Sequence, residues 1–209
     1  MREYSPLDHF LSHTERSARA MFAVFGMTPD TKAVAEDTLS ASDKKTSARL
    51  MRVNHAGEVA AQGLYHGQAF TARDENVKQQ MQACAQEEQA HLDWCEERLT
   101  ELEDHPSTLT LAWYLGSYAI GTAVGLLGDE WSLGFVSETE KQVVQHLDRH
   151  LRRLPDQDKK SREILLRMRE DEARHDKSAQ DAGAREVPGP ACHAMRAVSK
   201  IMTTTAYWV

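Results

Sequence analysis

The chain has 209 residues, with 32 aspartates and glutamates against 25 lysines and arginines, and a net charge of −7. This length suits one domain with a substantial core, and the acidic balance excludes the basic surface on which nucleic-acid-binding proteins depend. Three cysteines without CxxC spacing argue against a disulfide framework or a zinc knuckle, and the charged start MREYSPLDHF, which lacks an apolar segment, leads us to expect no export.

Helical periodicity runs through nearly the whole chain, whereas strand-like alternation is scarce. Residues 5–25 fit a short amphipathic helix, and residues 26–43 contain the glycine, proline, serine and threonine of a linker. Ser42 or Asp43 is expected to cap the first long helix. Four long helices are predicted in turn: over about 44–72, over about 75–103, from the end of the apolar stretch 109–128 to about 154, and over about 158–183.

The predicted fold is all-α. Four long helices joined by one long connection form a four-helix bundle, in which the apolar stretch 109–128 is the crossover between the second and third helices. Short extra helices are expected at both ends of the chain. The sequence accordingly divides into an N-terminal helix and linker at 1–43, the bundle at 44–187, and a C-terminal helical tail at 188–209.

Two of the predicted helices carry the motif ExxH, which places a carboxylate and an imidazole on one helix face. The motifs are Glu88 with His91 in EEQAHLD, and Glu172 with His175 in EDEARHD. A single ExxH motif usually lies on a solvent-exposed face of a helix. Here the residues one turn away are largely apolar: Leu165, Met168 and Ala179 around the second motif, and Met81, Cys84, Leu92 and Cys95 around the first. Ionised carboxylates on an apolar face are costly unless they are paired or bind a metal.

The first and third long helices each add one glutamate of the same kind. Glu140 shares a stripe with valines and leucines, whereas Glu138 shares its face with glutamines, so Glu140 is predicted to be buried and Glu138 exposed. Glu58 lies among apolar residues of the first helix. Glu170, beside the second ExxH motif, shares its face with charged residues and is predicted to face solvent.

The positions along the bundle test this assignment. The midpoint between Glu58 and Glu88 falls in the turn predicted near residue 73, and the midpoint between Glu140 and Glu172 falls beside Pro155. Residues equidistant from the turn of an antiparallel hairpin lie level with each other. Each hairpin therefore brings one lone glutamate opposite one ExxH motif, and all four carboxylates converge at one height.

Carboxylates and imidazoles without thiolates favour iron or manganese over a thiolate-rich zinc site. Four carboxylates with one histidine per metal form the ligand set of the ferritin-like di-iron proteins. The predicted ligands are Glu58, Glu88, His91, Glu140, Glu172 and His175.

Several neighbours of these ligands have weaker claims. Asp171 and Asp176 flank the second motif and are candidates to orient a histidine, with a surface acid as the ordinary alternative. His55 fits an outer contact or a core histidine better than a ligand. Tyr65 fits a core tyrosine or a relay for electrons or protons. The cysteines near the site, Cys84 and Cys95, are interpreted as small core residues.

The segments LMRVNHAGEVAAQGLYHGQA, EEQAHL, ETEKQVVQHL and DEARHD resemble the demethoxyubiquinone hydroxylase family over roughly residues 45–180. The resemblance implies that the six predicted ligands hold two iron ions. It implies O2-dependent hydroxylation of a polyprenylated 6-methoxy-3-methyl-1,4-benzoquinol, with two electrons from an external donor that the sequence does not identify. Other ubiquinone-biosynthesis proteins and a homo-oligomer are open as partners.

The apolar stretch 109–128 has twenty consecutive uncharged residues, enough to span a bilayer. A single crossing would separate Glu88 from Glu140, so spanning is excluded if both reach one site. The alternatives are a crossover buried along the bundle and a membrane-facing surface. The hydrophobic substrate that the resemblance implies favours peripheral attachment at the cytoplasmic face of the inner (cell) membrane. The tail at 188–209 fits an interfacial anchor, packing on the bundle, or self-association.

Three other functions fit parts of the pattern. A ferritin-like iron-storage or peroxide-detoxifying protein would share all six ligands, although the apolar crossover and aromatic tail suit a soluble cage poorly. A tRNA-nucleoside hydroxylase is disfavoured by the acidic balance. A metal-free bundle would leave four buried acids uncompensated.

Overall fold

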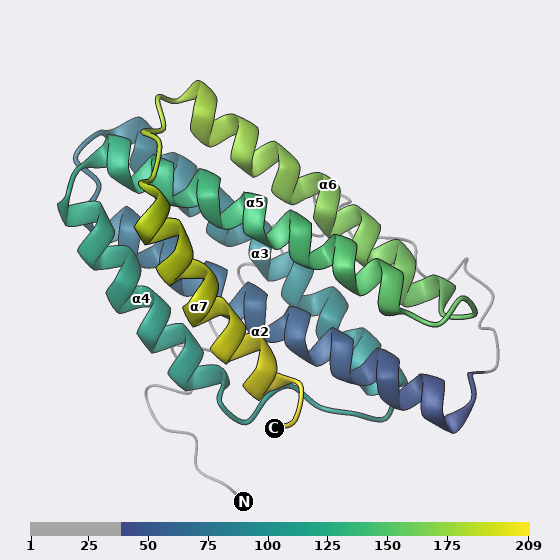
Figure 1. Cartoon of the computed structure of the whole chain (residues 1–209). Coiled ribbons are helices and arrows are strands. Elements are labelled where there is room, and N and C mark those ends of the chain that lie inside the picture. Colours follow the sequence, from purple (N-terminus) through teal and green to yellow (C-terminus); the bar gives the residue numbers. More distant parts are fainter. Residues whose placement is uncertain (1–38) are drawn as a thin grey trace, which may run out of the picture. The chain divides into compact units, whose positions relative to one another are not determined.

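The computed structural model describes residues 39–209, and all regular secondary structure in this part of the chain is helical (Figure 1). Its helices are α2 (Ala41–Thr71), α3 (Glu75–Glu101), α4 (Thr110–Leu126), α5 (Asp129–Arg153), α6 (Lys159–Asp181) and α7 (Gly189–Ala206). The all-α prediction is confirmed. The helix predicted over residues 5–25 and most of the predicted linker lie outside the described residues.

The bundle is built from two antiparallel hairpins, α2 with α3 and α5 with α6, and α3 also packs against α6 (Figure 1). Their turns fall at residues 72–74 and 154–158, where the sequence predicted them. The predicted cap of α2 is wrong. Ser40 is the N-cap, and its Oγ accepts a hydrogen bond from the N–H of Asp43 at 3.2 Å. Because serine at N-cap with an acid three residues later suits a helix start, α2 begins at Ala41 rather than near Lys44.

The crossover helix α4 packs directly on α2 through glycines. A Cβ atom at Gly67 would lie 2.3 Å from the carbonyl oxygen of Tyr118, and one at Gly121 would lie 2.2 Å from that of Leu64. The two backbones therefore approach so closely that only glycine fits at these positions. The stretch 109–128 is therefore a crossover that lies along the bundle, but it is not buried as that alternative required: only Gly121 and Gly125 of α4 are buried, and Leu111 and Leu126 are exposed. Within the described residues, no helix is long and apolar enough to cross a membrane.

The tail helix α7 packs on α2 and α5. Its C-terminal aromatic residues, Tyr207 and Trp208, contact the guanidinium of Arg49 on α2, with Cζ 5.2 Å and 4.3 Å from the two ring centroids. Cation–π contacts of this kind stabilise the docked tail. Of the alternatives for this segment, packing on the bundle is therefore confirmed.

A buried ion pair joins the C-terminal turn of α3 to the start of α6. The guanidinium of Arg98 donates to Asp158 Oδ1 through Nη2 and to Ser161 Oγ through Nε, each at 2.9 Å. Asp158 is also the N-cap of α6, since its carboxylate accepts the N–H of Ser161. The Arg98 and Asp158 side chains are 3% and 0% exposed, so water cannot solvate either charge if the other is removed.

The buried His150 of α5 should make stability depend on pH. Its Nδ1 lies 2.8 Å from Asn54 Oδ1, and burial, with smaller contributions from His146, Arg153 and Arg149, lowers its pKa to about 2. The unfolded chain therefore binds a proton at His150 below about pH 6.5 that the folded chain does not bind, and stability falls as the pH falls through this window.

We expect His150→Asn to reduce the dependence of the unfolding free energy on pH by roughly one proton, about 1.4 kcal/mol per pH unit, between about pH 4 and 5.5. Urea unfolding at several pH values measures this slope. An unchanged slope would show that His150 is protonated in the folded chain.

Candidate metal centre

The six predicted ligands meet in the middle of the bundle, and each is at most 5% exposed. They form two groups, in each of which one ligand atom per residue lies within 4.8 Å of the others. The first group is Glu58, Glu88, His91 and Glu172, and the second is Glu140, Glu172 and His175. Glu172 belongs to both groups, so the two form one continuous cluster with donors from α2, α3, α5 and α6.

Apolar residues close the cluster off at both ends. One core group, which includes Met51, Cys95 and Met168, lies along the bundle on one side, and a second, which includes Tyr65 and Cys84, lies on the other. Burial raises the pKa of the Cys84 thiol to about 12. Both cysteines are thus small core residues, as predicted, and the donors available at the centre are carboxylates and imidazoles.

The two histidines present the same nitrogen to the carboxylates. Nδ1 of His91 lies 3.0 Å from Glu88 Oε2 and 3.3 Å from Glu172 Oε1. Nδ1 of His175 lies 3.4 Å from Glu172 Oε2 and 3.5 Å from Glu88 Oε1. Both Nδ1 atoms therefore face the interior of the cluster, while both Nε2 atoms point away from it.

Each Nε2 atom meets an acid from the other ExxH helix. Nε2 of His91 on α3 lies 3.0 Å from Asp171 Oδ2 on α6, and Nε2 of His175 on α6 lies 3.0 Å from Glu87 Oε2 on α3. A carboxylate at one imidazole nitrogen holds the proton there and leaves the lone pair of the other nitrogen free to coordinate a metal ion. The arrangement is reciprocal, because each acid immediately precedes the glutamate of its own motif and reaches across to the other motif.

The motif pattern predicted one of these two acids, Asp171, as a partner of a histidine. Asp171 orients a histidine, although it is His91 and not the one in its own motif. Asp176 does not contact a histidine: its Oδ1 accepts from Ser137 Oγ at 2.6 Å, so that candidate is wrong. Glu87 was missed. The signal was the acid before each motif, which reads EEQAH in one case and DEARH in the other.

Of the two weaker candidates, Tyr65 contacts the cluster of predicted ligands and His55 does not. The hydroxyl of Tyr65 donates a hydrogen bond to Glu140 Oε1, and the ring meets that of His175 edge-on, with centroids 6.3 Å apart. Burial and the nearby Glu140 raise the pKa of Tyr65, so the phenol keeps its proton. His55 is buried but belongs to neither group of donors, and burial lowers its pKa to about 4.

Glu140 is more buried than Glu138, as predicted, but Glu138 is less exposed than the prediction required. Glu140 is 2% exposed and joins the cluster. The side chain of Glu138 is 20% exposed and lies 3.6 Å from Arg196 of α7, so it is half-buried beneath the tail helix rather than open to solvent. Glu170 is exposed, as predicted.

Charge in the cluster is unbalanced without a cation. Burial and the neighbouring Glu172 raise the pKa of both Glu88 and Glu140. Burial lowers the pKa of His175, but the neighbouring carboxylates of Glu172 and Glu87 outweigh it and bring the value to about 10. Four buried ligand atoms lack a hydrogen-bond partner among the described residues: Glu88 Oε1, Glu140 Oε2, Glu172 Oε1 and His175 Nδ1. Buried polar atoms are normally satisfied, and metal cations bound among these carboxylates and imidazoles would satisfy them.

Comparison with known proteins agrees with this centre. Residues 45–206 match the family model described as "Ubiquinone biosynthesis protein COQ7". A protein of Xanthomonas campestris is 51% identical over 211 residues, covering 99% of this chain and 96% of its own. Proteins of Ralstonia pickettii and Nitrosococcus oceani are each 48% identical over 214 residues, covering 96% and 100% of this chain and 99% of their own. All three carry the name 3-demethoxyubiquinol 3-hydroxylase. A family match over most of the chain, together with relatives of nearly equal length, shows that this chain belongs to the family of ubiquinone biosynthesis protein COQ7.

Proposed function

We propose that the chain hydroxylates a polyprenylated 6-methoxy-3-methyl-1,4-benzoquinol in ubiquinone biosynthesis. One atom of O2 enters the ring, and the other leaves as water after two electrons and two protons have been supplied by an external donor. The observation that carries the proposal is the buried four-carboxylate, two-histidine cluster in a chain about half identical to relatives named 3-demethoxyubiquinol 3-hydroxylase.

The residues of the centre fit two iron ions. Unpartnered carboxylate oxygens and the unpartnered Nδ1 atom of His175 converge with His91 in a buried space with no thiolate, which is the donor set that iron accepts. When bound, the two irons supply the O2 activation that ring hydroxylation requires. The protein would hold them with Glu58, Glu88, His91, Glu140, Glu172 and His175.

The surrounding side chains position donors and hold protons. Asp171 and Glu87 keep the Nε2 protons of the two histidines in place, so that each Nδ1 is available as a donor. Tyr65 holds a proton at its hydroxyl oxygen and donates it in a hydrogen bond to Glu140. The apolar core groups on both sides exclude water from the place where the oxidant acts.

A small cavity of about 50 Å³ lies against Glu58 and Glu172, with α7 residues such as Met202 and Thr203 on its other wall. It is the described opening that reaches the ligands from the α7 side, and we place the approach of the quinol ring there.

A labelled-oxygen experiment in cells tests the proposed reaction. Cells lacking the gene are expected to accumulate demethoxyubiquinone, and the intact chain is expected to restore ubiquinone carrying one oxygen atom from isotopically labelled O2. Mass spectrometry of lipid extracts measures both. A normal ubiquinone profile in the deletion strain, with no second hydroxylase present, would contradict the proposal. Iron storage or peroxide detoxification would then be the better explanation of the centre.

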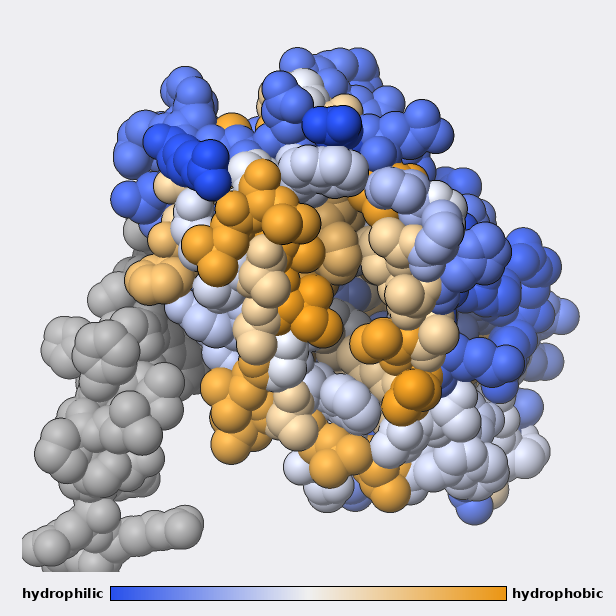
Figure 2. All heavy atoms as spheres, turned by 60° about the vertical axis from the view of Figure 1, so that its left-hand side comes forward, coloured by the Kyte–Doolittle hydropathy of each residue, from blue (hydrophilic) through white to orange (hydrophobic). Residues whose placement is uncertain are grey.

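We further propose peripheral attachment to the cytoplasmic face of the cell membrane. The outer face of α4 exposes large apolar side chains, among them Leu111, Leu115 and Leu126 at 70%, 56% and 63%. Val198 and Ile201 of α7 are also exposed, and Figure 2 shows apolar side chains gathered over one face of the molecule. An apolar face of this kind on a soluble bundle is typical of an interaction surface, and a polyprenyl substrate resides in the bilayer.

Substitutions on α4 test this attachment. Leu111→Asn and Leu115→Asn, made together, are expected to lower binding to lipid vesicles by at least about tenfold, because each leucine loses roughly 1.5–3 kcal/mol of apolar burial. Leu166→Asn is the matched control, since Leu166 is 46% exposed but lies on α6. Equal vesicle binding by the α4 variant and the control in a sedimentation assay would rule out attachment through α4.

The crossed acid–histidine pairs yield a separate prediction. Glu87→Gln and Asp171→Asn are each expected to weaken iron retention by about 10- to 100-fold, because each removes the carboxylate that orients a histidine. Asp176→Asn should retain iron normally, since Asp176 contacts Ser137 and not a histidine. Iron loss against a chelator measures the effect. Loss in Asp176→Asn as large as in the other two would show that these acids act through net charge alone.

A further inference from the structure

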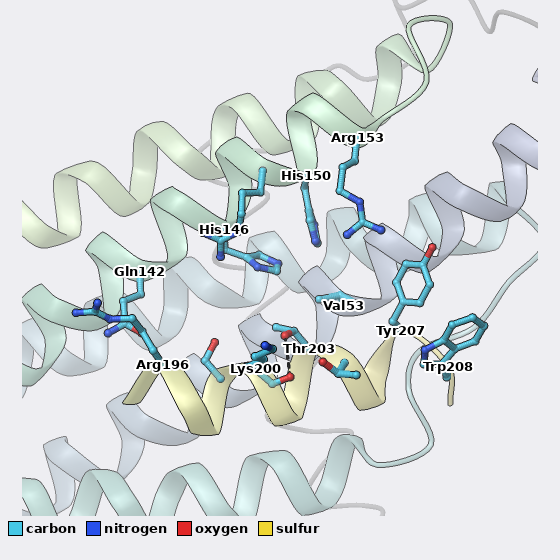
Figure 3. Close-up of a pocket in the computed structure, with 13 residues that line it drawn as sticks. Val53, Gln142, His146, His150, Arg153, Arg196, Lys200, Thr203, Tyr207 and Trp208 are labelled. Atoms are coloured by element: carbon cyan, nitrogen blue, oxygen red, sulfur yellow. Dashed lines mark hydrogen bonds between the residues drawn. The ribbon is translucent and has the colours of Figure 1, made fainter. Parts of the chain in front are cut away.

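A cavity of about 610 Å³ lies between α5 and α7, beside the metal centre but separate from its ligands (Figure 3). Arg149 and Arg153 line it from α5, and Arg196 and Lys200 line it from α7. The members of each pair are four residues apart, so each helix presents two cations on one face. Figure 3 places Arg196 beside Gln142 at one end of the cavity and Arg153 beside Tyr207 at the other, and no acidic residue lines it.

This concentration of positive charge stands out because the whole chain has a net charge of −7. Like charges four residues apart on a helix repel each other. Arg196 has a carboxylate nearby, with Nη2 3.6 Å from Glu138 Oε1. Arg149, Arg153 and Lys200 form no ion pair with an acid of residues 39–209, although the guanidinium of Arg153 lies over the Tyr207 ring, with Cζ 5.5 Å from its centroid. All four cations are exposed, so their side chains are free to turn toward a ligand that enters the cavity.

The rest of the lining supplies neutral hydrogen-bonding groups. His146 and His150 form the floor of the cavity, with ring centroids 3.9 Å apart, and the buried Nε2 of His146 has no hydrogen-bond partner among the described residues. The side chains of Ser199 and Thr204 also line it. A ligand that entered would meet charged donors at the walls and an unpartnered imidazole nitrogen at the floor.

We propose that this cavity binds a phosphate group. Arginine pairs with phosphate through two parallel N–H donors, and the cavity, which is lined by cations of both α5 and α7 along its length, has room for a phosphate and its substituents. The phosphate has two possible sources, the headgroup of an anionic lipid and a soluble phosphate compound. The neighbouring apolar face, to which α7 contributes Val198 and Ile201, favours the lipid headgroup.

The location has a consequence for the proposed hydroxylation. The phosphate cavity shares Val53, His146 and Thr203 with the small cavity that reaches Glu58 and Glu172. A lipid headgroup held at the phosphate cavity would bring the opening beneath α7 to the bilayer surface. This consequence rests on the proposed function, whereas phosphate binding itself does not.

Binding assays on the full chain test the proposal. Arg153→Gln removes one charge from the cavity, and Arg152→Gln removes one charge from the exposed residue beside it, which does not line the cavity. Both variants are compared in sedimentation with vesicles of phosphatidylglycerol and phosphatidylcholine, and in calorimetric titration with inorganic pyrophosphate. We expect Arg153→Gln to weaken binding about fivefold more than Arg152→Gln, as loss of one properly placed cation should.

The two assays distinguish the sources. A selective loss of vesicle binding in Arg153→Gln supports a lipid headgroup, and a selective loss of pyrophosphate binding with unchanged vesicle binding supports a soluble phosphate compound. Equal behaviour of Arg153→Gln and Arg152→Gln in both assays would overturn the site. Because neither assay involves hydroxylation, an inactive centre would leave this result unaffected.

Discussion

Replacing Glu140 with alanine is expected to abolish hydroxylation and to lower bound iron by at least about 100-fold. Loss of a residue that only hydrogen-bonds to a ligand typically costs about 10- to 100-fold in metal affinity, and loss of a ligand should cost more. Glu140 is one of four buried carboxylates at the centre, and it also accepts the hydrogen bond of Tyr65. Metal analysis of the purified chain and conversion of demethoxyubiquinone in complemented cells measure the two effects.

The control for this prediction lies two residues away on the same helix. Glu138→Ala removes an acid of the same size whose side chain is 20% exposed and whose contact with Arg196 is worth at most about 1 kcal/mol. It should retain iron and activity. The Glu140 variant is also expected to stay folded, because it removes one of several crowded negative charges. Full iron content in Glu140→Ala would remove Glu140 from the ligand set.

The largest loss of stability is expected for Arg98→Met. The substitution keeps an unbranched apolar stem but removes the guanidinium, which leaves the carboxylate of Asp158 buried without its partner and costs about 3–5 kcal/mol. Arg98 lies about two helical turns beyond His91 on α3, and Asp158 lies at the start of α6, before Glu172, so neither belongs to the ligand cluster. Urea unfolding of the two proteins measures the difference in unfolding free energy.

Two further variants separate loss of a buried partner from loss of a charge. Lys177→Met breaks an ion pair with Asp181 in which both side chains are mostly exposed, and it should cost no more than about 0.5 kcal/mol. Arg98→Met combined with Asp158→Ser keeps a residue type that caps helices and removes the unpaired charge, so it should recover part of the lost stability. If Arg98→Met cost no more than Lys177→Met, the buried pair would contribute nothing particular to the fold.

The ligand set was predictable because its geometry is local. Residues three apart share a helix face whatever the helix packs against, so Glu88 with His91 and Glu172 with His175 could be paired from spacing alone. Hairpin symmetry then placed Glu58 and Glu140 opposite them, because the rise per residue is the same in every α-helix. Helix periodicity and breakers likewise located the turns near residues 73 and 155.

The sequence by itself therefore determined the all-α class, the order of the bundle helices and the clustering of the six side chains predicted as ligands. Only the tertiary structure decided that Glu87 and Asp171 cross to the opposite motif, that glycines bring α4 onto α2, and that cations of α5 and α7 face one cavity. These features depend on how each helix is rotated and how closely it approaches its neighbour. Rotation and spacing are set by side-chain packing across the whole core, whereas periodicity within one helix is set by its own backbone.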